Sequence, residues 1–322
     1  MKMILFVQLL LASVNVLFAG PSKTYDATYT ATVSGIPADT ARIKVWIPLP
    51  KTRSLQRVSD LRIDSPYKWQ RGHDREFNND FIYATIDRPA SGDLVVPISF
   101  RITRSDAVLA ALPPAKARRA ELQRDLKADR LVTMSPRIRK MADEITAGKQ
   151  GTMEEANAIY HYVLNNMTYD KSKPGWGKGD TERACDIKAG NCTDFHSLFM
   201  SLARARGIPA RFVIGFPLTS KEHVVTGYHC WAEFYVDGKG WVPVDPSEAS
   251  KSSDPNVRTS LFGNLDADRL EFTIGRDLKL NPRTSEPLNY FIYPRAESAG
   301  TEVGLPAIKL QWHEVDSSRG SE

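Results

Sequence analysis

The first hundred residues of the chain alternate between apolar and polar side chains with the period of a β-strand. Between residues 24 and 104 the apolar positions recur at every second residue, as in Tyr25–Val33, Ile43–Ile47 and Val96–Ile102. Successive side chains of a strand point to opposite faces of a sheet, so the alternation predicts strands with one buried face. Short strands separated by turn residues favour an antiparallel β-sandwich, which we assign to residues 20–105.

After Pro114 the spacing of apolar residues changes from that of a strand to that of a helix. Ser135 followed by Pro136 is typical of a helix start, with an N-cap and a proline at the first helical position. Apolar residues then recur at helical spacing along a further segment: Ala156, Ile159, Tyr160, Val163, Leu164 and Met167. Another amphipathic helix is predicted from about Cys192 until Gly207 ends it. Strands and helices in separate stretches indicate an α+β chain.

A chain of 322 residues with 42% hydrophobic content is too long for one ordinary core, so we expect two domains. The second predicted domain covers residues 151–295. Residues 106–150 are predicted to form a helical connection, and residues 296–322 a C-terminal extension.

The formal net charge is +5, and basic residues are interleaved with acidic ones, as in Ala117–Asp129. This mixing indicates a solvated surface and not a nucleic-acid-binding stripe. It leaves open a mild attraction to an anionic cell wall or membrane surface.

The N-terminus has the pattern of a secretory signal peptide. Lys2 precedes an apolar run, and the small residues Ala19 and Gly20 follow it. We predict cleavage after Ala19, which leaves no stable membrane anchor and a periplasmic or secreted protein. The alternative is a retained anchor, but Gln8, Ser13 and Asn15 interrupt the apolar run.

The chain has three cysteines, Cys185, Cys192 and Cys230. Thiols of exported proteins usually pair, and an odd number leaves one thiol over. Cys192 follows Gly190 and Asn191 and opens a predicted helix. The first turn of a helix presents free N–H groups and the positive end of the helix dipole, which stabilise a thiolate and an oxyanion. The alternative is a buried structural cysteine.

A cysteine nucleophile also needs a base and a group that orients the base. His229 opens the predicted strand His229–Val236, and its imidazole can exchange a proton with Cys192. Asp245 ends the next predicted strand and can orient the imidazole. A structural histidine and a turn-forming aspartate before Pro246 are the simpler alternatives. Together the three residues predict a Cys192–His229–Asp245 triad.

Strand register decides whether His229 and Asp245 can meet. A loop of three residues, Asp237-Gly238-Lys239, would pair Val236 with Gly240 and place both side chains on one face. A plain four-residue loop would place them on opposite faces. We therefore predict the three-residue loop, or a longer one compensated by a bulge.

Two stretches resemble the transglutaminase-like superfamily: "GNCTDFHSLFMSLARARGIPARFVIGFP" (Gly190–Pro217) and "GYHCWAEFYVDGKGWVPVDPSEA" (Gly227–Ala249). The flanking stretches "VWIPLP" and "GRDLKLNPRTSEPLNYFIYP" resemble bacterial members with an additional N-terminal β domain. The resemblance implies a papain-like core in which the nucleophile helix packs on an antiparallel sheet. It carries the roles of nucleophile, base and orienting acid onto Cys192, His229 and Asp245.

The resemblance also implies chemistry on amide bonds of peptides or proteins through a thioester, by hydrolysis or by acyl transfer to an amine. Cell-wall peptide is a further possible partner. No acidic calcium loop is evident, and we expect neither a cofactor nor a metal. In some members an upstream aromatic supports the oxyanion, and Trp176 is the candidate here.

Three alternatives stay open on sequence grounds. The chain could be a non-catalytic envelope module that binds peptide or cell-wall material. A metal site could draw on Cys185, Cys192, His196, His229 and Cys230, although no closely spaced ligand pair supports it. Cys185 and Cys230 could form a disulfide, since strand alternation places the Cys230 side chain on the face opposite His229.

Overall fold

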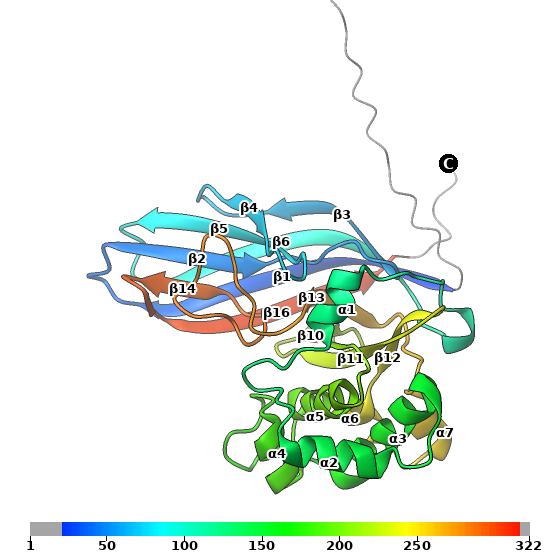
Figure 1. The fold of residues 1–322 in the computed structure, drawn as a ribbon. Coiled ribbons are helices and arrows are strands. Elements are labelled where there is room, and N and C mark those ends of the chain that lie inside the picture. The colour runs from blue at the N-terminus through cyan, green and yellow to red at the C-terminus, as the bar shows by residue number, and fades with distance from the viewer. Residues whose placement is uncertain (1–20, 316–322) are drawn as a thin grey trace, which may run out of the picture.

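The computed structural model describes residues 21–315, so the predicted signal peptide lies outside the described residues. Two five-stranded sheets face each other in a β-sandwich (Figure 1). Their strand orders are β10-β16-β1-β6-β3 and β15-β14-β2-β5-β4. The strands from the N-terminal part of the chain are β1 (Ser22–Ile36), β2 (Arg42–Pro48), β3 (Gln56–Ile63), β4 (Gln70–His73), β5 (Asp80–Asp87) and β6 (Gly92–Ser105).

The predicted alternation is present in β1, where Tyr25, Ala27 and Tyr29 are buried and the residues between them are partly exposed. The predicted strands of this region are thus confirmed.

C-terminal residues complete this sandwich. The strand β16 (Leu305–Glu314) pairs antiparallel with β1, and β14 (Arg295–Ser298) pairs with β2. The short strand β15 (Thr301–Glu302) pairs with β14. We had set residues 296–322 apart as an extension and did not anticipate this pairing, because long-range strand partners leave no local pattern in the sequence.

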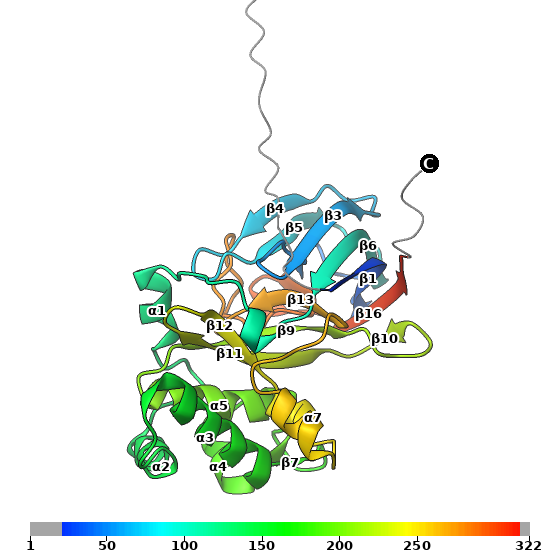
Figure 2. The same ribbon diagram turned by 90° about the vertical axis from the view of Figure 1, so that its right-hand side faces the viewer.

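A third, four-stranded sheet with the order β12-β11-β9-β13 lies between the sandwich and a layer of helices (Figure 1, Figure 2). Its strands are β9 (Ala210–Pro217), β11 (His229–Val236), β12 (Gly240–Val244) and β13 (Arg269–Ile274). On the sandwich side, Val213 and Trp231 belong to one apolar cluster with Trp46 and Phe81. On the helical side, α5 (Cys192–Ala205) packs against β11 and β9.

The helical layer surrounds α5, which is almost entirely buried. Its neighbours are α2 (Pro136–Ile145), α3 (Gly151–Asn166), α4 (Thr181–Ile187) and α6 (Pro246–Ala249). The remaining elements are α1 (Arg119–Asp125), α7 (Pro255–Ser260), a 3-10 turn (Leu109–Ala111) and the short strands β7 (Thr168–Tyr169), β8 (Ala189–Gly190) and β10 (Val224–Val225). The expected α+β arrangement, with the cysteine-bearing helix packed on an antiparallel sheet, is present.

No helix within residues 21–315 is long and apolar enough to cross a membrane.

Candidate active site

Cys192 is the first residue of α5 and is 2% exposed. Asn191 caps the helix, since its Oδ1 accepts a hydrogen bond from the Thr193 amide at 2.9 Å. Asp194 completes a capping box by accepting from the Asn191 amide at 2.9 Å. Cys192 is thereby fixed at the positive end of the helix dipole, where a thiolate is stabilised.

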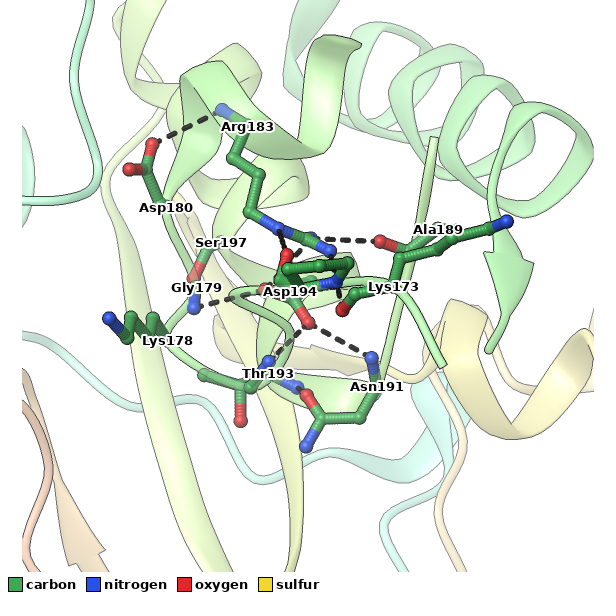
Figure 3. A network of polar contacts seen from close by, with 12 residues as sticks. Lys173, Lys178, Gly179, Asp180, Arg183, Ala189, Asn191, Thr193, Asp194 and Ser197 are labelled. Carbon is green, nitrogen blue, oxygen red and sulfur yellow. Dashed lines mark hydrogen bonds and ion pairs between the residues drawn. The ribbon is translucent and has the colours of Figure 1, made fainter. Parts of the chain in front are cut away.

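The carboxylate of Asp194 also ties the preceding loop to this helix start (Figure 3). Its oxygens accept hydrogen bonds from the amides of Gly177 at 2.7 Å and Gly179 at 3.1 Å. Arg183 Nη1 lies 4.0 Å away. A Cβ atom on Gly190 would lie 2.2 Å from Asp194 Oδ2, so only glycine fits beside the carboxylate.

The hairpin has the predicted register. Val236 pairs with Gly240 and Ala232 with Val244, which leaves a three-residue loop. Gly240 adopts a φ of +90°, a conformation that glycine accepts most readily. His229 Nε2 lies 2.7 Å from Asp245 Oδ2, so the two side chains meet as the predicted register requires. The other ring nitrogen of His229, Nδ1, is left free for Cys192.

Asp245 is completely buried, and several donors surround its carboxylate. It is the N-cap of α6, and its Oδ1 accepts from the Ser247 hydroxyl and the Glu248 amide, each at 2.9 Å. Arg269 Nη1 donates to Oδ2 at 2.6 Å. His196 Nε2 lies 3.3 Å from Oδ1, close enough for an ion pair but without the alignment of a hydrogen bond.

These contacts set the charges of the site. Burial alone would raise the pKa of Cys192, but hydrogen bonds from Cys230 and His229 and the nearby imidazole charge hold it well below its usual value. Burial opposes a charged His229, yet Asp245 and Cys192 together raise its pKa to about 9. Despite its burial, Asp245 has a pKa well below the ordinary range because of His229 and Arg269. These directions favour a thiolate on Cys192 beside an imidazolium on His229.

The disulfide between Cys185 and Cys230 that the sequence left open is not formed. Cys230 Sγ lies 3.8 Å from Thr193 Oγ1 and 3.5 Å from His196 Nδ1, so this thiol faces the start of α5. All three cysteines are free thiols, and Cys185 belongs to α4.

Sequence reasoning considered His196 only as a possible metal ligand and missed Arg269 and Tyr228. His196 stands four positions after Cys192, so helical spacing could have placed both on one face of α5. Arg269 comes from β13 and has no local signal. The Tyr228 hydroxyl lies 3.0 Å from Thr193 Oγ1 and accepts from Asn191 Nδ2 at 3.2 Å.

Trp176 lies in the loop that Asp194 holds, and 40% of its surface is exposed. The Lys171 ammonium lies 5.5 Å from the ring centroid. Within residues 21–315, no hydrogen bond or ring contact joins Trp176 to Cys192, so oxyanion support by this residue stays a prediction. In the same range, no group of three or more His, Cys, Asp or Glu side chains is arranged to hold a metal ion.

Residues 139–246 match the family model described as the transglutaminase-like superfamily. This range contains Cys192, His229 and Asp245. An uncharacterized protein of Haemophilus influenzae is 29% identical over 317 residues, which is 86% of each chain. A protein-glutamine gamma-glutamyltransferase of Pseudomonas aeruginosa is 28% identical over 122 residues, covering 35% of this chain but only 18% of that protein.

Among solved structures, a candidate cysteine protease from Cytophaga hutchinsonii superposes with a TM-score of 0.62 over 93% of both chains. Its sequence identity of 14% supports a shared fold alone. Residues 139–246 are thus identified as a domain of the transglutaminase-like superfamily.

Proposed function

We propose that this protein is a cysteine enzyme that cleaves amide bonds of peptides or proteins through a thioester, with Cys192, His229 and Asp245 as its triad. The observation that carries the proposal is the distance of 2.7 Å between His229 Nε2 and buried Asp245, beside a cysteine fixed at the start of α5. A thiolate beside an oriented imidazolium is the arrangement that acyl transfer through cysteine requires.

In the first half of the reaction, the Cys192 thiolate attacks the amide carbonyl carbon and forms a C–S bond. The developing oxyanion would be stabilised at the start of α5. His229 gives its proton to the leaving nitrogen, and the C–N bond breaks. Asp245 keeps the imidazole oriented and stabilises its charge without taking the proton.

In the second half, neutral His229 takes a proton from the incoming nucleophile, which attacks the thioester and releases Cys192. Water gives hydrolysis, by a peptidase or a deamidase. A primary amine gives transamidation, as the name of the Pseudomonas aeruginosa relative would suggest. Both outcomes use the same three residues, so the acceptor must be identified by experiment.

The acceptor can be identified with glutamine-containing peptides incubated with and without a fluorescent primary amine. Ammonia release alone indicates deamidation, incorporation of the amine indicates transamidation, and new peptide termini indicate proteolysis. Cys192→Ala should abolish whichever signal appears, while Cys185→Ala is the matched control and should retain it. If Cys192→Ala remains fully active in every assay, the proposal is wrong.

We also propose that the protein is exported and acts on peptide or protein in the cell envelope, possible cell-wall peptide included. The support is the predicted signal peptide, whose residues lie outside the described range. N-terminal sequencing of the exported protein should begin at or near Gly20. A mature protein that keeps Met1–Phe18 would contradict export by cleavage.

A further inference from the structure

Short contacts join His229, Asp245, His196 and Cys230 in the buried site beside Cys192. Asp245 faces His229 through Oδ2 and His196 through Oδ1, at 2.7 and 3.3 Å. His196 Nδ1 lies 3.5 Å from Cys230 Sγ. Cys230 Sγ also lies 3.8 Å from Oγ1 of Thr193, the residue that follows Cys192 in the first turn of α5. The proposed mechanism uses only three of these five residues and gives no role to His196 and Cys230.

The two thiols differ in chemical character. Hydrogen bonds from Cys230 and His229 outweigh burial at Cys192 and hold the pKa of that thiol well below its usual value. Burial and the adjacent Cys192 raise the pKa of Cys230 well above the usual value. Oxidants react with thiolates, so Cys192 is the group that a hydroperoxide attacks first. Cys230 keeps its proton and stays beside the oxidised sulfur.

We propose that Cys230 is a resolving thiol, which captures a sulfenic acid formed on Cys192 as a reversible Cys192–Cys230 disulfide. Such a disulfide occupies the sulfur that the proposed function uses as nucleophile, so it switches the enzyme off. It also protects Cys192, because a sulfenic acid that is not captured goes on to irreversible sulfinic and sulfonic acids.

The reaction balances with a hydroperoxide as the oxidant. The Cys192 thiolate attacks the terminal peroxide oxygen, the O–O bond breaks, and that oxygen stays on sulfur as a sulfenic acid. The other oxygen takes the proton of His229 and leaves as water or alcohol. Cys230 then attacks Cys192 Sγ, an S–S bond forms and the S–O bond breaks. The released hydroxide takes the Cys230 proton and leaves as water. Two sulfurs are each oxidised by one electron, and one peroxide is reduced.

His196 is placed to carry that proton. The Asp245 carboxylate favours the His196 proton on Nε2, which leaves Nδ1 free to accept from the Cys230 thiol at 3.5 Å. A disulfide requires its sulfurs to close to about 2.05 Å, and Cys230 Sγ already lies beside the first turn of α5, which begins at Cys192. Cys185 offers no such route, because it lies in α4, and burial raises its pKa to about 11.

The test treats the full chain with hydrogen peroxide, blocks the remaining thiols with iodoacetamide, and maps the peptides without reduction. We expect a cross-linked pair of peptides that contain Cys192 and Cys230, the loss of two titratable thiols, and full recovery of both after treatment with a dithiol. Cys185→Ala is the matched control and should give the same cross-link. In Cys230→Ser, Cys192 should instead gain two or three oxygen atoms, which a dithiol cannot remove.

The inference rests on the reactive Cys192 of the proposed function, but its failure can be recognised separately. If iodoacetamide alkylates Cys192 in untreated protein, yet peroxide drives wild-type Cys192 to sulfinic acid with Cys230 still alkylatable, the switch is wrong and the nucleophile stands. If Cys192 reacts with neither reagent, both proposals are wrong. The peptide map of peroxide-treated wild-type protein shows whether the Cys192–Cys230 disulfide forms, even if Cys230→Ser does not fold.

Discussion

Arg269 Nη1 lies 2.6 Å from Oδ2 of Asp245, the same oxygen that faces His229 Nε2 at 2.7 Å. Arg269 is 6% exposed and Asp245 is fully buried, so the ion pair is closed off from water. A buried carboxylate is tolerated only when charges and hydrogen bonds compensate it. The guanidinium thus lets an ionised carboxylate persist behind His229.

Removal of Arg269 should therefore destabilise the fold as well as the site. Arg269→Met leaves Asp245 with its Ser247, Glu248 and histidine partners, so we expect a loss of about 2–3 kcal/mol of unfolding free energy in urea titrations. Arg118→Met is the control, because Arg118 forms an exposed pair with Glu121 and should change little. Equal stabilities of the two variants would show that the Arg269 pair contributes nothing.

Asp245→Asn should lower turnover by about 10²–10⁴-fold while the fold is retained, because an amide neither enforces the histidine tautomer nor stabilises the imidazolium. Turnover and a thermal melt of the same sample separate the two effects. The matched control is Asp237→Asn in the exposed loop of the same hairpin, which should keep its activity. Turnover of Asp245→Asn close to wild type would remove the orienting role from Asp245.

Gly240 should tolerate substitution less well than Gly238, although both have positive φ values. A Cβ atom on Gly240 would lie 2.9 Å from Ala115 Cβ and 3.0 Å from the Ala115 carbonyl oxygen, whereas Gly238 has nothing within 4 Å. Alanine at either position costs about 1–2 kcal/mol for the backbone conformation. Gly240→Ala should cost more by the clash, and an equal loss in urea unfolding would refute the close contact.

The pH dependence of acylation should have its alkaline limb near pH 9. The thiolate of Cys192 is present well below the usual thiol pKa, and the proton for the leaving nitrogen stays on His229 until its raised pKa of about 9. kcat/KM should hence be flat around neutrality and fall as the pH rises through 9.

The raised pKa of His229 also makes the stability of the fold depend on pH. His229 binds its proton more tightly in the folded than in the unfolded chain, so its contribution is complete below about pH 6.5 and is lost as the pH rises through 9. In Asp245→Asn the alkaline limb should move to lower pH. A rate that keeps rising from pH 8 to 10 would indicate an ordinary thiol and contradict the ion pair.

Local patterns predicted the elements that carry the site. The two-residue period of Tyr25–Val33 predicted a strand with one buried face, and Ser135 with Pro136 predicted the start of α2. The register of the hairpin could be predicted because side chains alternate between the two faces of a strand. A slip of one residue would place His229 and Asp245 on opposite faces. These features depend on neighbours close in sequence.

The features that escaped prediction depend on distant neighbours. Trp312 in β16 is buried against the N-terminal sandwich, although nothing around it indicates its partner β1. Arg269 lies in β13, and nothing in the sequence indicates that its guanidinium pairs with Asp245 and not with another acid. The contacts of Cys230 with Thr193 and His196 also depend on distant residues, because α5 lies 34 to 37 positions earlier in the chain.

The rate of alkylation of each thiol by iodoacetamide at pH 6, in the folded full chain, tests the central claim most directly. Cys192 and Cys185 are 2% and 5% exposed, so access does not favour Cys192 and a preference must come from its thiolate. An ordinary thiol is only about 0.3% ionised at this pH. Even with the lower intrinsic nucleophilicity of an acidic thiolate, Cys192 should react at least ~10-fold faster than Cys185 and Cys230. If Cys192 reacts no faster than Cys185, it is not a thiolate nucleophile, and the proposed enzyme mechanism is contradicted.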